Sequence, residues 1–389
     1  MNILFITARF PYPPLKGDQV VPYHRLRLLS KKHKVTLITF YQSNKELECL
    51  DKLKPFCQDI LTVKLGKLRS FSNMFGGIFS KLPFQVIYFS SIKFRRTLAG
   101  LLASKNFDII HTYTLRLAEY TKDLNKKKIL DLIDSMQLNY QKRVIIERWF
   151  LRGIFKNESE RINIYEKEII QKYDLSILVS EKDKEAINLE KVVAIPLGVE
   201  TDVFKNKGEL PNNKTIIFSG NMKYYPNEKA IIWFFRNCFG VLKQNIPDVK
   251  LIIAGSNPTR EIKSLHDGIS VFVTGFVESM AETLCRAQLA IAPMQSGYGM
   301  HIKMLEAMSC GLPVVCTSSA LGAIRASNGK EVIVADNIED FVDSCIRLLL
   351  DYKLAQRMGR DAQSLVSLKY SWETHAGMID TMYRRVATT

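Results

Sequence analysis

The feature that most constrains the fold of this chain is a repeated alternation of short apolar runs with helical stretches. The runs are rich in β-branched and aromatic residues, and several end at a glycine, as residues 215–219 do at Gly220. Strands that alternate with helices in this way form βαβ units, and successive units build a parallel sheet. The predicted strands are residues 2–7, 35–40, 59–63, 107–111, 128–132 and 175–179, followed by 215–219, 249–254, 270–274, 289–293 and 313–317.

The alternation occurs in two series, which are separated by residues 195–200 (IPLGVE). Pro196 and Gly198 interrupt the periodic pattern there, as expected of a joint between two compact units. A chain of 389 residues is also longer than one ordinary domain. We therefore predict an α/β protein with two doubly wound, Rossmann-like domains. Residues 137–172 are predicted to be a long amphipathic helical stretch in the first of them.

The positive charge is concentrated in the first half of the chain. Lys and Arg number 55 against 39 Asp and Glu, a net charge of +16. Residues 1–195 carry 34 basic and 20 acidic residues, whereas residues 196–389 carry 21 and 19. This asymmetry indicates a polyanionic partner, such as nucleic acid, an anionic membrane surface or a phosphorylated ligand. A well-solvated lysine-rich surface explains the same counts without any partner.

Residues 67–96 interleave aromatic and bulky aliphatic residues with Lys and Arg, and they contain no acidic residue. This composition is typical of a segment that lies on anionic lipid. We therefore predict membrane contact by this segment. The alternative is a helix that packs against the domain core and has a basic outer face.

Three observations bear on the compartment. The seven cysteines are odd in number and include no C-x-x-C pair, which indicates buried thiols in a reducing compartment. The longest uncharged stretch, residues 307–324, contains Gly311 and Pro313 and is therefore not a membrane-spanning helix. The first residues lack the basic region of a signal peptide. We expect a cytoplasmic protein.

The densest functional signal is residues 293–317. Gly297 and Gly299 let the backbone approach a ligand closely, and the N-terminus of the next helix, where free N–H groups favour an anion, follows them. Lys303 and Glu306 lie three residues apart on one face of that helix. This arrangement suits a nucleoside diphosphate, with Lys303 on the phosphates and Glu306 on the ribose hydroxyls. An ordinary connection with a surface Lys–Glu pair is the alternative.

Other loops follow the predicted strands at their carboxyl ends, where open α/β sheets bind ligands. These loops combine small residues with lysines, and they are Ser219–Lys223, Gly255, Gly275–Val277 and, in the first half, Pro14–Gly17. We expect them to line one crevice between the two domains.

Five segments carry a resemblance to a known family, namely GMHIKMLEAMSCGLPVV, IPLGVETDVF, GNMKYYPN, VTGFV and YSWE. Together with the N-terminal NILFITARFPYPPLKGD, and in order and spacing along almost the whole chain, they resemble the GT-B glycosyltransferases of family GT4, especially the bacterial group that builds exopolysaccharide, capsule or O-antigen. The resemblance implies two Rossmann-like domains that face each other across a cleft. It implies an acceptor on residues 1–195, a UDP- or GDP-linked sugar on residues 196–370, and a helix, 371–389, that returns to the first domain. It also implies transfer with retention of anomeric configuration.

The family pattern implies roles for individual residues. Glu306 matches the second glutamate of the family's E-x7-E pattern, which holds the ribose, and Lys303 and Lys223 match positions that face the diphosphate. Gly17 matches a glycine loop near the donor phosphate and the acceptor, and Gly275–Val277 matches the loop whose backbone meets the base. The complete donor-binding prediction is Gly17, Gly220, Asn221, Gly275, Phe276, Val277, Gly297, Tyr298, Gly299, Met300, His301 and Glu306.

Two positions depart from the family pattern. Tyr298 stands where the first glutamate of E-x7-E is expected, which puts the identity of the donor sugar in doubt. Ile133-Asp134 stands where many relatives carry a His-Asp pair, and His111, which ends the preceding predicted strand, is a candidate to replace the missing histidine. A structural role for His111 is the alternative. The predicted catalytic residues are Lys303, Lys223, Asp134 and His111, with Asp134 orienting the acceptor.

The predicted function is retaining transfer of a sugar from a nucleotide-diphosphate sugar to a glycan or polyprenyl-diphosphate-linked acceptor, at the inner face of the cell membrane. Catalysis rests on stabilising the charge of the departing diphosphate. We expect no metal, since the chain has no D-x-D pattern and no zinc-type spacing of Cys and His. A nucleotide-sugar epimerase and a non-catalytic nucleotide-binding protein remain alternatives. A nucleic-acid-binding protein is a third, without a recognition helix or an RNP-like motif to support it.

Overall fold

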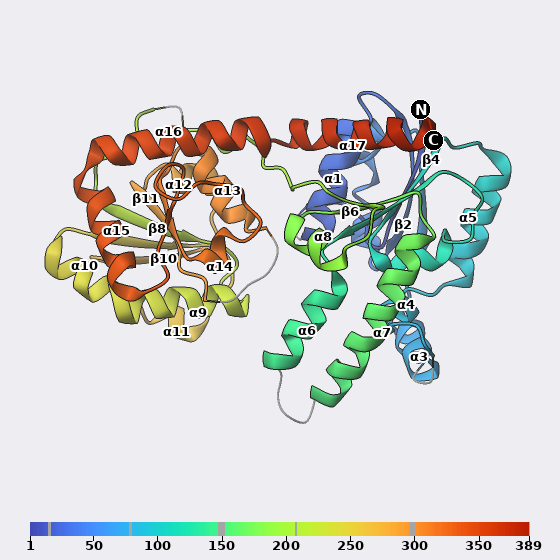
Figure 1. Cartoon of the computed structure of the whole chain (residues 1–389), viewed down its shortest axis with the longest axis horizontal. Coiled ribbons are helices and arrows are strands. Elements are labelled where there is room, and N and C mark those ends of the chain that lie inside the picture. Colours follow the sequence, from blue (N-terminus) through green and yellow to red (C-terminus); the bar gives the residue numbers. More distant parts are fainter. Residues whose placement is uncertain (15–16, 78–79, 147–151, 207, 296–299, 389) are drawn as a thin grey trace. The chain divides into compact units, whose positions relative to one another are not determined.

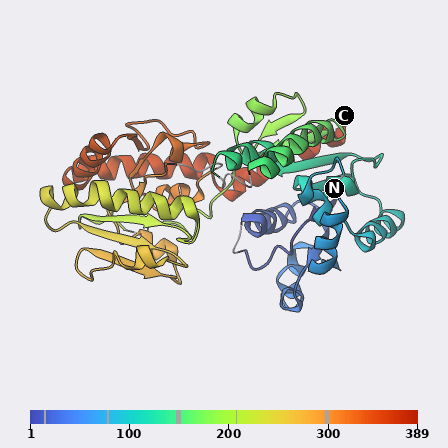
Figure 2. The same ribbon diagram turned by 90° about the horizontal axis from the view of Figure 1, so that it is seen from below.

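The computed structural model describes residues 1–389 except 15–16, 78–79, 147–151, 207, 296–299 and 389. It divides the chain into two compact units, one of residues 1–196 with 376–389 and the other of residues 197–375. We call them the N-terminal domain and the C-terminal domain. Each contains one parallel sheet with helices on both of its faces (Figures 1 and 2). The predicted α/β class with two doubly wound domains is confirmed.

The N-terminal sheet has seven strands in the order β3-β2-β1-β4-β5-β6-β7. All pairs are parallel, and Ile3 of β1 lies between Val35 of β2 and Ile109 of β4. The strands are β1 (Asn2–Thr7), β2 (Lys34–Tyr41), β3 (Asp59–Lys64), β4 (Ile109–Tyr113), β5 (Lys128–Ile133), β6 (Leu175–Leu178) and β7 (Val192–Ala194). The strand order reverses between β1 and β4, and at such a reversal the loops diverge and leave room for a ligand at the carboxyl edge.

Alternate side chains of β1 enter cores on opposite faces of this sheet. Leu4 belongs to the cluster that contains Phe94, whereas Phe5 stacks on the ring of His111. The helices are α1 (Gly17–Leu29), α2 (Asn44–Leu47), η1 (Leu50–Lys52), η2 (Lys54–Phe56), α3 (Lys67–Gly76), α4 (Phe84–Tyr88), α5 (Ile92–Ser104), η3 (Leu115–Tyr120), α6 (Met136–Ile146), α7 (Arg152–Gln171) and α8 (Glu181–Ile187).

The helical stretch predicted at residues 137–172 is divided into two helices, α6 and α7, that pack against each other (Figure 1). The carboxylate of Glu166 in α7 accepts hydrogen bonds from Ser135 Oγ at 2.7 Å and from the Met136 N–H at 2.9 Å. Glu166 therefore satisfies donors at the N-terminus of α6. This tertiary contact stabilises a hairpin of helices that the helical periodicity of the sequence does not reveal.

The last helix, α17 (Trp372–Thr388), begins in the C-terminal domain and continues into the N-terminal domain. Buried polar contacts hold it there. Tyr383 Oη lies 2.8 Å from His111 Nδ1, and Asp380 Oδ1 lies 2.9 Å from His33 Nε2. The predicted return of the terminal helix to the first domain is confirmed.

The C-terminal sheet has six parallel strands in the order β10-β9-β8-β11-β12-β13. The strands are β8 (Thr215–Ser219), β9 (Lys250–Ala254), β10 (Val271–Gly275), β11 (Leu289–Ala292), β12 (Val314–Cys316) and β13 (Ile333–Val334). The helices are α9 (Tyr225–Phe234), a π-helical turn (Phe235–Phe239), α10 (Gly240–Asn245), α11 (Arg260–Lys263), α12 (Met280–Leu284), α13 (Ile302–Ser309), α14 (Ser318–Leu321), α15 (Ile338–Leu350) and α16 (Tyr352–Lys369). The order reverses between β8 and β11, as it does between β1 and β4.

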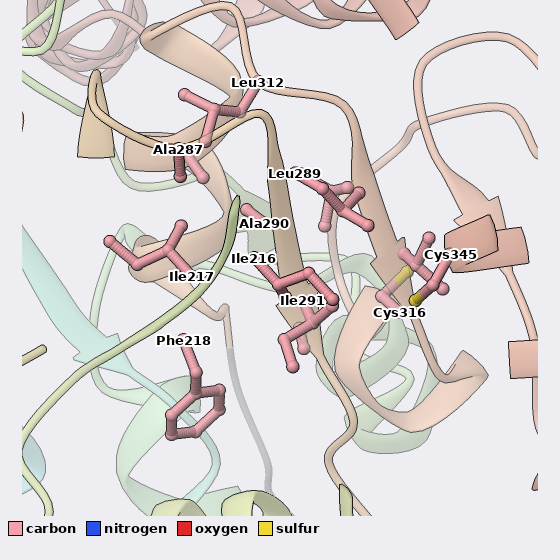
Figure 3. Packing of buried hydrophobic residues seen from close by; sticks show 14 of the residues in the cluster. Ile216, Ile217, Phe218, Ala287, Leu289, Ala290, Ile291, Leu312, Cys316 and Cys345 are labelled. Atoms are coloured by element: carbon pink, nitrogen blue, oxygen red, sulfur yellow. The ribbon is translucent and has the colours of Figure 1, made fainter. Parts of the chain in front are cut away.

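The core of the C-terminal domain lies around β8 and β11, where Ile216 and Ile291 are fully or almost fully buried (Figure 3). Cys316 and Cys345 contribute free thiols to the same core (Figure 3). All seven cysteines are free, but Cys49 and Cys285 are only half-buried. The interpretation of the cysteines as buried thiols therefore holds for five of them.

Gly311 and Gly359 let α16 cross the end of α13 at close range. A Cβ atom on Gly359 would overlap the carbonyl oxygen of Gly311 and would lie 2.9 Å from its carbonyl carbon. Gly311 itself has a φ of 73°, a conformation that favours glycine. The contact between these two helices therefore depends on the missing side chain at Gly359.

We predict that Gly359→Ala lowers the free energy of unfolding of the C-terminal domain by about 1–3 kcal/mol, since overpacking a tight contact costs that much. The control is Gly240→Ala, where a Cβ meets nothing within 4 Å. That helical substitution should leave stability unchanged or raise it by up to about 1 kcal/mol. Urea unfolding followed by circular dichroism measures both, and equal stabilities of the two variants would contradict the packing argument.

Candidate functional site

The candidate site lies at the reversal of the C-terminal sheet, and its base is made of backbone. The Gly220 N–H donates to the carbonyl of Ala254 at 3.0 Å, and a Cβ on Gly255 would overlap the carbonyl oxygen of Gly220. Gly220 has a φ of 145° and Gly255 a φ of 139°, values that side-chain-bearing residues rarely adopt. The ends of β8 and β9 therefore meet without side chains between them, which leaves their edge open to a ligand.

Lys303, in the first turn of α13, reaches the end of β8. Its Nζ donates to Asn227 Oδ1, lies 3.8 Å from Met294 Sδ, and lies 4.5 Å from the centroid of the Phe218 ring. A Cβ on Gly220 would come within 3.3 Å of this Nζ. The ammonium group therefore occupies space that the missing side chain of Gly220 provides, and the face of an aromatic ring stabilises it.

Asn227 joins Lys303 to the loop after β8. Its side chain is buried in the first turn of α9, where Nδ2 donates to the carbonyl of Asn221 at 2.9 Å while Oδ1 accepts from Lys303. Asn227 is the last residue of the segment GNMKYYPN but is not among the site residues predicted from the sequence. The signal that could have found it is a polar residue in the first turn of a helix that follows a glycine loop.

Burial shifts the ionisation of Lys303 and Glu306, which lie one turn apart on α13. Loss of hydration lowers the pKa of Lys303 to about 7, against the opposing effect of the Glu306 carboxylate. Loss of hydration raises the pKa of Glu306 to about 7, against the opposing effect of the Lys303 ammonium. Both groups therefore change charge near neutral pH. Oppositely shifted groups at the ligand-binding edge of a sheet are typical of a functional site.

His301 immediately precedes α13 and is only 9% exposed. Burial, assisted by the charge of Lys303, lowers the pKa of His301 to about 4, so the imidazole is neutral at pH 7. Its Nε2 is buried and has no hydrogen-bond partner among the residues that the structure describes. Because buried polar atoms are almost always paired, this nitrogen is a candidate contact for a ligand.

The loop after β10 presents an aromatic ring. Gly275 has a φ of 70° and its carbonyl accepts from the Gly255 N–H at 3.0 Å, which ties this loop to the loop after β9. Phe276 follows and is 75% exposed, while Val277 is half-buried. An exposed ring beside the strand ends is suited to stacking on a flat ligand.

Of the remaining residues predicted for the site in the C-terminal domain, the structure describes some and not others. Asn221 and Lys223 are exposed in the loop after β8, and the Lys223 N–H donates to Asn221 Oδ1 at 3.1 Å. Met300 is half-buried and packs against the domain core, whereas residues 297–299 (Gly297, Tyr298, Gly299) lie outside the described residues.

Two predicted residues of the N-terminal domain lie at strand ends. Gly17 is the exposed first residue of α1. Asp134 follows Ile133, whose φ of 68° is strained for a β-branched residue, at a register shift between Asp131 and Ile133. Such strain is often found at functional sites, and here it sets the direction in which the half-buried Asp134 leaves β5.

The surroundings of His111 do not favour the predicted contact with a donor sugar. The side chain is fully buried, Nε2 lies 3.1 Å from Asp131 Oδ2, and Nδ1 lies 2.8 Å from Tyr383 Oη. Arg25 pairs with the same carboxylate of Asp131. Because both ring nitrogens have protein partners, His111 has a structural role that joins β4 and β5 to α17.

Metal ligation has no visible support in the part of the chain that the structure describes. Among those residues, no group of three or more His, Cys, Asp or Glu side chains is arranged to hold a metal ion. Among the described residues, the groups at the C-terminal edge that could hold a ligand include the ammonium groups of Lys303 and Lys223, the Glu306 carboxylate and the neutral imidazole of His301.

Comparison with known proteins gives matches over part or nearly all of the chain. Residues 213–351 match the family described as glycosyl transferases group 1. A relative from Klebsiella pneumoniae, an uncharacterized 44.6 kDa protein in the cps region, is 26% identical over 86% of this chain and 88% of its own length. The phosphatidyl-myo-inositol mannosyltransferase of Mycobacterium leprae is 25% identical over 58% of this chain and 62% of its own length.

Solved structures resemble the whole chain. Sucrose-phosphate synthase from Thermosynechococcus elongatus superimposes with a TM-score of 0.70 and 15% identity, over 99% of each chain. The Anabaena protein HepE, solved in complex with UDP, superimposes with a TM-score of 0.69 and 13% identity, over 99% of this chain and 100% of its own. These similarities establish the two-domain GT-B fold.

We predict that the ε-carbon resonance of Lys303 titrates near pH 7 in carbon-13 NMR of lysine-labelled protein, because burial favours the neutral amine. The variant Lys303→Met assigns the resonance. In Glu306→Gln the pKa of Lys303 should fall further, since the carboxylate that favours the charged form is gone. A Lys303 resonance that titrates near the ordinary value of 10.4 would contradict the burial of the ammonium.

Proposed function

Because residues 213–351 match the family described as glycosyl transferases group 1 and the chain has the GT-B fold, we propose that it is a retaining GT4-type glycosyltransferase of bacterial surface polysaccharide synthesis. It takes a sugar from a UDP- or GDP-linked donor on the C-terminal domain. It transfers that sugar to a glycan or polyprenyl-diphosphate-linked acceptor on the N-terminal domain. The observation that carries the proposal is the half-buried Lys303 beside Gly220 at the reversal of the sheet.

The donor fits the groups at this edge one by one. The ammonium of Lys303 binds the diphosphate, which restores its charge, and the exposed Lys223 supplies a second cation. The Glu306 carboxylate, which has no hydrogen-bond partner among the described residues, accepts from the ribose hydroxyls. Phe276 stacks on the base. The neutral imidazole of His301 contacts the donor near α13.

The chemistry requires stabilisation of the leaving group more than a strong base. The bond between the anomeric carbon and the diphosphate oxygen breaks as the acceptor oxygen forms its bond on the same face of the sugar. The diphosphate gains negative charge, which Lys303 stabilises in a site with little water. The proton of the acceptor hydroxyl passes to the departing diphosphate, and Asp134 orients that hydroxyl. Measurement of the anomeric configuration of the product by NMR tests retention, since an inverted product would exclude it.

Two relatives support the choice of acceptor. One is encoded in a cps region, and the other is named for a mannosyl transfer to a phosphatidyl-myo-inositol. A lipid-linked acceptor agrees with the basic N-terminal half of this chain. Among the described helices, none is long and apolar enough to cross a membrane.

An exposed apolar surface on α3 is suited to the inner leaflet. Leu68 is 90% exposed and Phe71 is more than half exposed, and the two lie three residues apart on one face of this helix. On α5, Ile92, Lys93 and Arg96 are exposed as well. Apolar side chains that insert at the headgroups, together with cations that attract anionic lipid, make a peripheral membrane site. We name the surface of Leu68 and Phe71 the apolar rim.

We predict that one nucleoside diphosphate among UDP, GDP, ADP and CDP raises the thermal stability of the protein, by an amount equal to about 2.7 kcal/mol at 100 times its dissociation constant. Glu306→Ala and Lys303→Met should each weaken binding by about tenfold or more, because each removes a charge-assisted contact. Glu339→Ala, an exposed glutamate on α15, is the matched control. No stabilisation by any of the nucleotides would exclude a donor-binding transferase.

Phe276 provides a second arm of the same measurement. Phe276→Ala should cost about 1–3 kcal/mol of nucleotide binding if its ring stacks on the base. Ile269, which is 76% exposed in the same domain, provides the control Ile269→Ala. Equal affinities of these two variants would remove Phe276 from the site and would leave the roles of Lys303 and Glu306 unchanged.

We predict that the protein floats with vesicles that contain phosphatidylglycerol and that Leu68→Glu weakens this binding by roughly tenfold, because it removes an inserted side chain and adds a negative charge. The control Leu368→Glu replaces an exposed leucine of α16 in the C-terminal domain. Added salt should weaken binding of the wild type. If the wild type did not float with the vesicles at moderate salt, or if Leu68→Glu and Leu368→Glu floated equally, a membrane role of the apolar rim would be excluded.

The alternative of an epimerase is distinguished by products. An epimerase converts the donor sugar without an acceptor, whereas the proposed transferase forms a new glycosidic bond only when an acceptor is present. A non-catalytic nucleotide-binding protein would be stabilised by nucleotide and would form neither product.

A further inference from the structure

The N-terminal domain contains a pocket of about 450 Å³ that the proposed donor site does not use. Its lining includes Ser72 and Gly76 of α3, Arg95 of α5, and Arg116 and Glu119 of η3. α3 packs against α4 (Figure 1). α4 in turn packs against η3. The volume is within the usual range for a ligand pocket. The two arginines, Arg95 and Arg116, make this pocket a candidate site for an anionic ligand.

The two guanidinium groups of this pocket form their hydrogen bonds and ring contacts with neutral groups. Arg116 Nε donates to Gln85 Oε1 at 2.7 Å, and its guanidinium lies 5.8 Å from the centroid of the Phe89 ring. Arg95 lies 5.3 Å from the centroid of the Tyr120 ring. Among the described residues neither forms an ion pair with a carboxylate. Arginines placed on aromatic faces without counter-ions are well suited to phosphate oxygens.

The acidic residue of the pocket does not cancel this charge. Glu119 Oε1 accepts from Tyr165 Oη at 2.9 Å and lies 2.9 Å from Lys122 Nζ. Because Glu119 already has a cationic partner, the pocket keeps an excess of positive charge. An anionic ligand would therefore replace water around Arg95 and Arg116 without displacing a protein carboxylate.

The position of Arg116 connects the pocket with the carboxyl edge of the N-terminal sheet. Arg116 follows β4 closely in the chain. Burial lowers the pKa of Arg116, the charge of Asp18 raises it and the charge of Arg9 lowers it, and these two residues flank the loop after β1. Arg9 Nε pairs with Asp18 at 2.7 Å. Arg116 therefore lies both at the pocket and near the loop after β1, on the side of the β1–β4 reversal where an acceptor is expected. At its other side lies α3, which carries the exposed Leu68 and Phe71.

We propose that this pocket binds the diphosphate of a polyprenyl-diphosphate-linked acceptor, with Arg95 and Arg116 on the phosphate oxygens and the hydrocarbon chain leaving along the apolar rim. The inference rests on the proposed function, which supplies a lipid-linked acceptor. Two forked guanidinium groups match the several oxygens of a diphosphate better than the single charge of a bulk phospholipid. The apolar rim matches the hydrocarbon chain that such an acceptor carries.

Binding of the full chain to two kinds of vesicle tests the proposal. One kind is phosphatidylcholine with a small fraction of polyprenyl diphosphate, and the other is phosphatidylcholine with enough phosphatidylglycerol to give the same surface charge. Arg116→Gln and Arg95→Gln should each bind the polyprenyl diphosphate vesicles about tenfold more weakly than the wild type, as expected for a lost charge-assisted contact. Their binding to phosphatidylglycerol vesicles should change less than about twofold.

Arg96→Gln is the matched control, because Arg96 is exposed on α5 and does not line the pocket. It should affect both kinds of vesicle equally and by less than about twofold. If Arg116→Gln and Arg95→Gln both bound the polyprenyl diphosphate vesicles as tightly as the wild type does, the proposal would be overturned. Equal losses on both kinds of vesicle would overturn it as well, since the arginines would then serve general attraction to anionic lipid.

Two further measurements keep the result interpretable. Arg95 is exposed, so Arg95→Gln tests the pocket even where Arg116→Gln disturbs folding. Nucleotide stabilisation of the same variants separates this proposal from the proposed function. A wild type that binds polyprenyl diphosphate selectively but no nucleotide would contradict the donor site alone. A wild type that binds nucleotide but does not distinguish the two vesicles would contradict the pocket alone.

Discussion

The half-buried ammonium group of Lys303 at the edge of the C-terminal sheet is the constraint on which the candidate site depends. Lys303 reaches this position because Gly220 has no side chain, and it is held there by the Phe218 ring and the amide of Asn227. None of these partners is a carboxylate, so the free energy of the charged form is incompletely compensated. A bound diphosphate would supply the missing anion. The missing side chain at Gly220, the hydrogen bond to Asn227 and the shifted pKa values of Lys303 and Glu306 all follow from the position of this ammonium group.

The two domains use the same sheet geometry for related chemistry. Each strand order reverses next to the first strand of its domain, and a cation lies after a strand at that reversal, Lys303 in one domain and Arg116 in the other. In our account both cations bind diphosphates, one of the donor and one of the acceptor. The compact ammonium of lysine suits the donor diphosphate, which departs during the reaction. The rigid, planar guanidinium of arginine suits the acceptor diphosphate, which is only bound.

Much of the fold could be predicted from the sequence, because buried parallel strands are short β-branched runs and their helices are periodic. β7 and β13 were missed, since three and two residues are too few to show a period. The packing of α6 against α7 is held by the contact of Glu166 with Ser135, a tertiary contact that no local pattern encodes.

The parts of the candidate site that are formed by residues close together in the sequence could be predicted. Lys303 and Glu306 share a helical face, and Gly220 and Gly275 end their strands. Asn227 required knowledge of which loop meets α13, and the surroundings of His111 include Tyr383, which lies 272 residues later. The pocket of Arg95 and Arg116 likewise arises from packing between helices, for which the basic and aromatic composition of residues 67–96 was the only local sign.

The most direct test of the account is the structure of the protein bound to the nucleoside diphosphate that stabilises it. The account predicts a diphosphate oxygen within hydrogen-bond distance of Lys303 Nζ and the ribose hydroxyls on the Glu306 carboxylate. A nucleotide bound at another edge of the sheet, or one whose phosphates lie away from Lys303, would contradict it.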